Sequence, residues 1–191
     1  YLGIFFEVIK NAVSMDLYTS YTAQYMDVTN FLVIFQTAIQ LKEYDWAASF
    51  IRQYGDRISP EYSEDIINYA FSELFFSKKQ YEHSLSSLSK VRLKLFRLKI
   101  PVKNLELRLY YELNYIEEAY SLIDSFIHFL TSNKKIRNDE RKNHMKFVEF
   151  YREILKAKAA SGKTRTNKDF KKELLAASLL PHKAWLVEKT A

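Results

Sequence analysis

The sequence contains no cysteine, and only three glycines and three prolines among its 191 residues. Without cysteine the chain has no disulfide, no thiolate zinc site and no cysteine nucleophile. The scarcity of glycine and proline disfavours an all-β fold, which needs many tight turns, and it also disfavours a disordered chain. Fourteen tyrosines and fourteen phenylalanines supply apolar material for a core. We therefore expect an ordered, helical protein.

Long apolar stretches are also missing. The longest unbroken one is Phe31–Phe35, far short of the roughly 20 residues that cross a bilayer. The first residues include Glu7 and Lys10 and show no cleavage-like pattern, so they do not resemble a signal peptide. These features predict a cytoplasmic protein without a membrane span.

The net charge of +6 arises in the second half of the chain. Residues 1–100 hold 11 basic and 11 acidic residues, whereas residues 101–191 hold 18 and 12. Basic residues cluster at 90–99 and 156–172, and such clusters can bind phosphate backbones or acidic peptides. The candidate contacts with an anionic partner are Lys90, Arg92, Lys94, Arg97, Lys99, Lys163, Arg165 and Lys168. The alternative is a solvated helix face and a solubilising linker.

Apolar residues recur at spacings of three and four along most of the chain, which predicts amphipathic α-helices. The clearest case is the stretch Asn114–Leu130. After a first helix at about 2–18, Asn30 is expected to cap the next one, and Pro101 is expected to end a later one. The helices should pair into three hairpins and be followed by one long helix, at about 30–58, 60–98, 102–132 and 139–158.

The predicted domain organisation follows from these elements. Residues 1–158 form a helical repeat domain. Residues 159–167 are small, polar and basic, which is typical of a flexible linker. Residues 168–191 are expected to form short helices that cap the stack.

Three stretches of the sequence echo one another. They align at a small residue, Ala47, Ser84 or Ala119, with spacings of 37 and 35 residues. A period in the mid-thirties with two helices per unit is typical of a helical solenoid. One hairpin cannot bury its own apolar face, so stacking of hairpins would supply the core.

The pattern resembles the tetratricopeptide repeat. In that family the second helix begins with an aromatic residue and has a small residue three positions later, as in Tyr44-Asp-Trp-Ala47 and Tyr81-Glu-His-Ser84. The first helix of the middle repeat carries the expected bulky and small pair, Phe71-Ser72. The tail "PHKAWLVEKTA" also resembles the ends of bacterial repeat proteins.

Two repeats depart from the family pattern. Phe35 and Leu107 replace the small residue of the first helix, and Ile116 replaces the aromatic residue of the second helix in the third repeat. The alternative is an irregular helical bundle whose hairpins share only a binary pattern of apolar and polar residues.

The resemblance implies an all-α fold, a right-handed superhelical stack of antiparallel helix hairpins with C-terminal capping helices. It also implies a non-catalytic scaffold that binds a protein or peptide on a concave surface built from the first helices. Polar residues on those helices are the candidate peptide contacts, namely Gln36, Gln40, Asn68 and Ser72. An alternative function is nucleic-acid association through the two basic clusters. The oligomeric state stays open.

Signatures of catalysis are weak throughout. The segment "SGKT" at 161–164 resembles the end of a phosphate-binding loop, but Ala157 stands where that loop needs a glycine. The four histidines have no metal-ligand spacing. Paired acids such as Glu64/Asp65 and Glu117/Glu118 fall near predicted helix starts, where they complement the helix dipole. We therefore assign no catalytic, cofactor-binding or metal-ligating residue and expect no enzyme.

Overall fold

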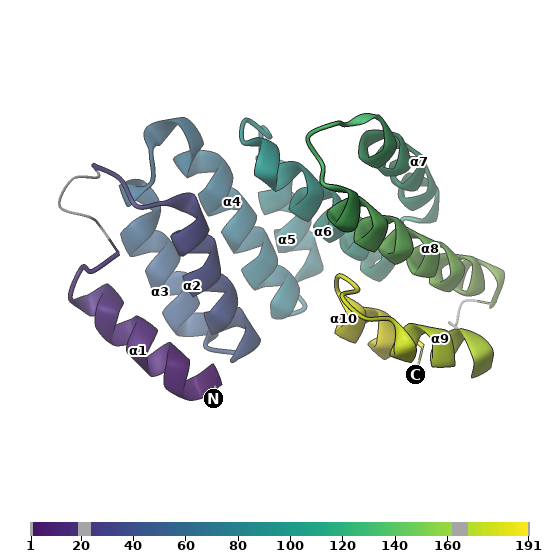
Figure 1. The fold of residues 1–191 in the computed structure, drawn as a ribbon, viewed down its shortest axis with the longest axis horizontal. Helices are drawn as coiled ribbons and strands as arrows, with labels where there is room; N and C mark the ends of the chain where they lie inside the picture. The colour runs from purple at the N-terminus through teal and green to yellow at the C-terminus, as the bar shows by residue number, and fades with distance from the viewer. Residues whose placement is uncertain (1, 19–23, 162–167, 191) are drawn as a thin grey trace. The chain divides into compact units, whose positions relative to one another are not determined.

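The structure is a computed structural model that describes residues 2–18, 24–161 and 168–190. Within these ranges the chain forms helices and turns and no strand, which confirms the predicted all-α class (Figure 1). None of the described helices is long and apolar enough to cross a membrane. The helices are α1 (Leu2–Ser14), α2 (Val28–Gln40), α3 (Tyr44–Tyr54), η1 (Gly55–Arg57), α4 (Pro60–Ser77), α5 (Tyr81–Leu88), η2 (Phe96–Leu98), α6 (Lys99–Leu113), α7 (Ile116–Ser132), α8 (Asn138–Ser161), α9 (Lys168–Ala176) and α10 (Lys183–Glu188).

The chain divides into two units, which we call unit 1 (Tyr1–Leu109) and unit 2 (Tyr110–Ala191). The division falls inside α6. The sequence had placed the boundary after residue 158, with the C-terminal helices apart from the repeats. In the structure α10 packs against α8 and α9, so these helices form one unit with α7.

The turn inside each hairpin has the same backbone geometry. Lys42, Lys79 and Asn114 adopt left-handed conformations with φ of 62°, 59° and 63°. In each turn the next amide donates a hydrogen bond to the carbonyl five positions earlier, at 3.0, 2.9 and 2.8 Å. This pattern is the Schellman motif that ends many helices. The three turns lie 37 and 35 residues apart, the spacing of the echoed stretches in the sequence. The same geometry also ends α1, where Asp16 has a φ of 56° and the Leu17 amide donates to the Ala12 carbonyl at 2.9 Å.

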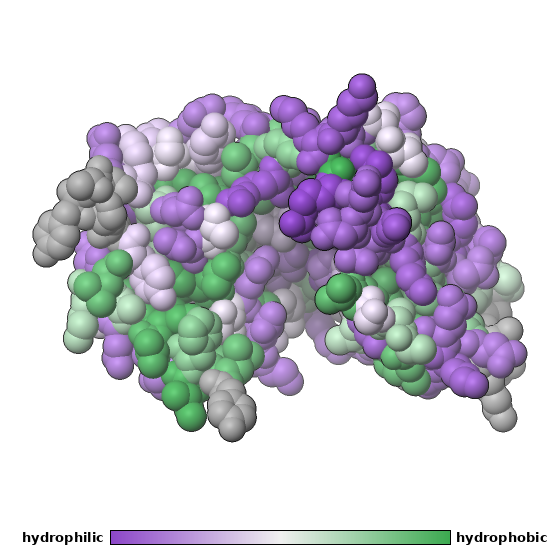
Figure 2. Space-filling model, in the orientation of Figure 1, coloured by the Kyte–Doolittle hydropathy of each residue, from purple (hydrophilic) through white to green (hydrophobic). Residues whose placement is uncertain are grey.

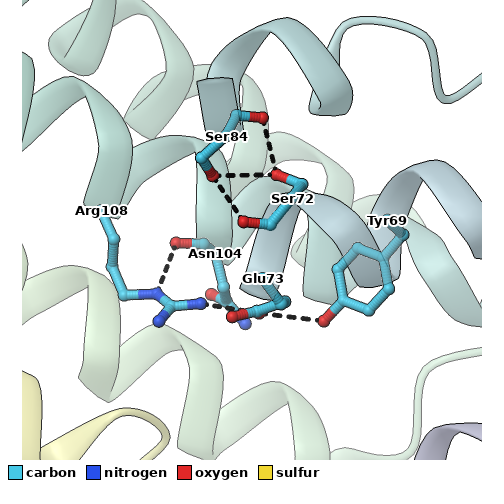
Figure 3. Close-up of polar contacts among 6 residues, drawn as sticks. All are labelled: Tyr69, Ser72, Glu73, Ser84, Asn104 and Arg108. Carbon is cyan, nitrogen blue, oxygen red and sulfur yellow. Dashed lines mark hydrogen bonds and ion pairs between the residues drawn. The ribbon is translucent and has the colours of Figure 1, made fainter. Parts of the chain in front are cut away.

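The middle hairpin is held closely together by two serines. The Ser72 hydroxyl of α4 donates to the Ser84 carbonyl of α5 at 2.8 Å, and the Ser84 hydroxyl donates to the Ser72 carbonyl at 2.7 Å (Figure 3). Both residues are fully buried. Larger side chains would separate the helices, which explains why small residues occupy these two positions.

The second helix of the middle hairpin is shorter than predicted. We expected it to continue to about residue 98, but α5 ends at Leu88 and Leu93 has a left-handed φ of 55°. The buried carboxylate of Asp65 accepts hydrogen bonds from the amides of Arg92 and Lys94, at 2.8 and 3.0 Å. These bonds stabilise an irregular segment, although its apolar spacing is compatible with a helix.

Two predicted helix boundaries are also wrong. Asp27 caps α2 in place of Asn30, because its side chain accepts hydrogen bonds from the first amides of the helix, including that of Thr29 at 2.7 Å. Pro101 lies in the first turn of α6 and terminates nothing, since a proline in that turn removes no intrahelical hydrogen bond. Residues 159–161 of the predicted linker continue α8, and its remainder lies outside the described residues.

The core of unit 1 contains a ladder of aromatic rings along α3. The rings of Trp46, Phe50 and Tyr54 stack with centroid distances of 5.2 and 5.1 Å. Phe6 of α1 meets Trp46 edge to face at 5.0 Å. The Tyr54 hydroxyl donates to the Val13 carbonyl at 3.1 Å. The ladder therefore anchors α1 to the first hairpin.

A polar cluster fixes α10 within unit 2. The Glu112 carboxylate accepts hydrogen bonds from the Trp185 indole at 2.7 Å and from the Lys189 ammonium at 2.6 Å. Trp185 also meets the ring of Tyr111 edge to face at 5.3 Å and stacks on the buried Tyr151 at 6.1 Å. The C-terminal helix is short, and these contacts explain its position.

Candidate functional site

An open cavity of about 540 Å³ lies in unit 1 beside the start of α4. The helix α4 supplies five of its eight lining residues, and the other three come from η1, the residue after η1 and the segment after α5. The lining residues are Asp56, Ile58, Pro60, Ser63, Glu64, Ile67, Asn68 and Lys90. The cavity thus combines an amide, an ammonium group and two carboxylates with apolar surface.

The helix α4 places three of these residues on one side. Pro60 begins the helix, as the Ser59-Pro60 pair predicts, and Glu64 and Asn68 follow at intervals of four residues. Residues four apart lie on the same helix face. The Ser63 hydroxyl donates to the Gly55 carbonyl at 3.1 Å, which holds η1 against the helix.

Lys90 reaches the cavity because the segment after α5 leaves the helical path. Lys90 lies two residues after the end of α5, and the Asp65 carboxylate binds the amides two and four positions further on. The Lys90 side chain is exposed. Asp65 was interpreted as an acid that complements the dipole of α4, but its main role is to hold this segment.

The structure brings together two candidates that the sequence had assigned to different partners. Asn68 was a candidate peptide contact, and Lys90 a candidate for an anionic partner, yet both line the same cavity. Gln36 and Gln40 are exposed on α2 and do not line it. Sequence reasoning missed Asp56. The helix face shared by Glu64 and Asn68 could have been predicted from their spacing of four residues.

The assignment of Ser72 to a peptide-binding surface is wrong. Its side chain is fully buried, and its hydroxyl is bonded to Ser84 of the neighbouring helix. The residue was assigned to the surface because it is polar and lies on a first helix. Its small size, which the family resemblance had also noted, is the property that matters for packing.

Two arginines of the basic cluster at 90–99 contact other residues of the protein surface. The guanidinium of Arg92 lies 3.5 Å from the Glu64 carboxylate, and that of Arg97 donates to the Thr29 hydroxyl at 2.6 Å. Burial raises the pKa of Asp27, but hydrogen bonds at the helix start and the nearby Arg97 outweigh it, so the pKa is lowered. The cluster is therefore divided among several contacts.

The other predicted basic contacts differ in environment. Lys94 is exposed, and the ammonium of Lys99 lies 5.8 Å from the ring centroid of Phe96. Lys163 and Arg165 lie outside the described residues. Lys168 begins α9, and only its backbone is described.

A second polar cluster in unit 1 is closed to solvent. Arg108 of α6 forms an ion pair with Glu73 of α4 at 2.8 Å, and the Tyr69 hydroxyl donates to the same carboxylate at 3.1 Å (Figure 3). The guanidinium also lies 4.5 Å from the ring centroid of Phe76. Burial, and then the charge of Glu73, raise the pKa of Tyr69. The cluster joins two helices and leaves little of its surface for a ligand.

We find no group of three or more histidine, aspartate or glutamate side chains that could hold a metal ion within the described ranges. His144 is half-buried, and its ring lies 6.3 Å from that of Phe126. Burial lowers the pKa of His144 from 6.5 to about 4. Its imidazole is therefore neutral at physiological pH.

Searches with the whole chain find no significant match to a protein-family model, to a curated protein or to a solved structure.

Proposed function

We propose that this chain is a non-catalytic, tetratricopeptide-like module that binds a segment of another polypeptide in the cavity formed by Asn68 and Lys90. The observation that carries the proposal is the composition of that cavity, which offers hydrogen-bonding and charged groups beside apolar surface. The recurring hairpin turn supports the repeat character of the module.

The cavity suits an extended peptide for a chemical reason. A side-chain amide such as that of Asn68 both donates and accepts hydrogen bonds, so it matches a main-chain peptide group. The ammonium of Lys90 would bind a carbonyl or carboxylate of the segment. The carboxylates of Asp56 and Glu64 would bind a basic side chain, while Pro60 contributes apolar contact. Gln36 and Gln40 remain proposed contacts for a longer segment.

The alternative proposal, nucleic-acid binding, has less support. Two of the five basic residues at 90–99 contact acidic or hydroxyl groups of the protein itself. Nucleic-acid contacts need several cations that can replace counterions on the phosphates. Retention of the chain on heparin that declines steeply with salt would favour this alternative.

Selection from a random peptide library on the immobilised chain tests the proposal. Selected peptides should bind the wild-type protein, and their Kd should rise at least tenfold, about 1.4 kcal/mol, on the variants Asn68→Ala and Lys90→Glu. Lys78→Glu is the matched control, because Lys78 is exposed at the far end of α4 and does not line the cavity.

Two outcomes would contradict the proposal. The library could yield no specific peptide, or the selected peptides could bind the variants at Asn68 and Lys90 as tightly as the wild type. Circular dichroism of each variant separates loss of binding from loss of folding.

A further inference from the structure

Helix α1 carries two apolar stripes on different faces. The inner stripe is buried in unit 1 and comprises Phe6, Ile9 and Val13. The outer stripe comprises Phe5, Val8 and the half-buried Ala12, and Met15 continues it one residue past the end of the helix. Both stripes have spacings of three and four residues, the pattern with which a helix packs against another helix. The inner stripe has its partner in the aromatic ladder of α3, and the outer stripe faces solvent.

The outer stripe belongs to a larger exposed apolar surface. The exposed fractions are 51% for Phe5, 59% for Val8 and 69% for Met15, and the neighbours Leu2, Ile4 and Leu17 are 41%, 72% and 68% exposed. Figure 2 shows hydrophobic residues gathered over α1. Contiguous apolar patches above a few hundred Å² are rare on monomers and mark interaction sites.

The area fits a protein interface. The outer side of α1 alone, with Ile4, Phe5, Val8 and Met15, leaves roughly 500 Å² accessible, and residues at the two ends of the helix would bring the contact towards the about 800 Å² that each partner buries in a standard interface. The charged flank of the helix is neutralised internally, because Lys10 pairs with Glu7 at 2.6 Å. A partner with a similar apolar helix would therefore meet little net charge.

We infer that a second copy of this chain covers the outer stripe, with the two α1 helices antiparallel about a two-fold axis. The spacings from Phe5 to Met15 are three, four and three, so they read the same in both directions. An antiparallel copy places Phe5 opposite Met15 and Val8 opposite Ala12. Methionine sulfur makes favourable contacts with aromatic rings, and the small Ala12 allows a close approach. A two-fold interface requires this kind of self-complementarity.

The oligomeric state of the full chain tests the inference. Light scattering after gel filtration should give a dimer whose fraction rises with protein concentration. Val8→Glu should weaken the dimer at least tenfold, because it would bury a charge without a partner, and should leave the helical content unchanged. Leu175→Glu is the matched control, since Leu175 is 53% exposed on α9 and lies outside the stripe.

Cross-linking tests the antiparallel arrangement. The chain has no cysteine, so a variant with Phe5→Cys and Met15→Cys should form a disulfide-linked dimer on oxidation. Phe5→Cys alone should remain uncross-linked, because the two copies of residue 5 would lie about 15 Å apart along the helices.

Three results would overturn the inference. They are a monomer at all concentrations, a dimer unaffected by Val8→Glu, and efficient cross-linking of Phe5→Cys alone. A monomer that binds a different protein through Val8 would assign the surface to another partner and equally reject a second copy.

Discussion

Gly55 is a position where an added methyl group would clash with the side chain of Ile67 in α4. A Cβ atom built on this residue would lie 2.6 and 2.7 Å from two side-chain carbons of Ile67. Its φ of −58° is ordinary, so the requirement for glycine comes from space and not from backbone conformation.

We expect Gly55→Ala to lower the free energy of unfolding by about 1–3 kcal/mol, the usual cost of overpacking a core. Thermal denaturation followed by circular dichroism measures the loss. Gly3→Ala is the control, because nothing lies within 4 Å of a Cβ atom built on Gly3. In a helix that substitution should stabilise the protein by up to about 1 kcal/mol. Equal stability of Gly55→Ala and wild type would reject the packing argument.

The burial of His144 predicts how the free energy of unfolding changes with pH. Burial lowers its pKa to about 4 in the folded protein, whereas an unfolded chain has a histidine pKa of about 6.5. The unfolded state therefore binds more protons between these values. The stabilising contribution is complete above pH 6.5 and is lost as the pH falls towards 4.

The contribution of His144 can be isolated by comparing urea denaturation of the wild type and of His144→Gln across this pH range. We expect the wild type to lose about 1–2 kcal/mol more than the variant as the pH falls. Parallel pH profiles of the two proteins would show that burial of His144 has no such effect.

At the scale of elements, the Schellman turns of the three hairpins use residues that are not optimal for their backbone. Lys42 and Lys79 have left-handed φ values, which cost a non-glycine residue about 1 kcal/mol or more. Lys79→Gly should therefore raise the free energy of unfolding by about 0.5–1 kcal/mol. Denaturation by urea provides the measurement.

The neighbouring Lys78 offers a matched control for that prediction. It has a φ of −85° and is exposed like Lys79, so Lys78→Gly gains nothing from the freedom of glycine and should destabilise slightly. A stabilising effect at both positions would mean that removal of positive charge, and not backbone strain, explains the result.

Element types were predictable from periodicity, but some boundaries were not. The stretch Asn114–Leu130 was correctly predicted to be helical, and the observed α7 begins at Ile116. The end of α5 was missed because its cause is Asp65, a residue far away in sequence whose carboxylate binds two later amides. Local spacing contains no information about such a contact.

For the whole molecule, the polar cluster at Glu112 controls how firmly the C-terminal helix is held in unit 2. Glu112 and Lys189 are 11% and 15% exposed in their side chains. Burial lowers the pKa of Lys189, but hydrogen bonds to the carboxylates of Glu112 and Glu188, and their charges, outweigh it, so the pKa is raised. Removal of the Glu112 carboxylate would leave both Lys189 and the Trp185 indole without this acceptor.

Glu112→Ala should lower the free energy of unfolding of unit 2 by about 3–5 kcal/mol, as expected when one partner of a buried ion pair is removed. Limited trypsin digestion with mass spectrometry should show faster cleavage after Lys183 in α10. Glu188→Gln is the control, since Glu188 is 57% exposed. Unchanged cleavage in Glu112→Ala would contradict the role of this cluster.

The candidate site was only partly predictable for a similar reason. Asn68 and Lys90 were each identified from polarity or charge, but their meeting in one cavity depends on the irregular segment after α5. Ser72 was misplaced because polarity alone does not separate a surface hydroxyl from one buried between two helices. Side-chain chemistry was accessible from the sequence, whereas proximity required the structure.

The positions of the two tryptophans have a practical consequence. Trp46 lies in the aromatic ladder of unit 1 and Trp185 in the C-terminal cluster of unit 2, and the chain has no other tryptophan. Each half of the protein therefore contains one tryptophan. Replacing either one by phenylalanine leaves a single tryptophan whose emission reports on the other half, so the unfolding of each unit can be followed in the intact chain without a label.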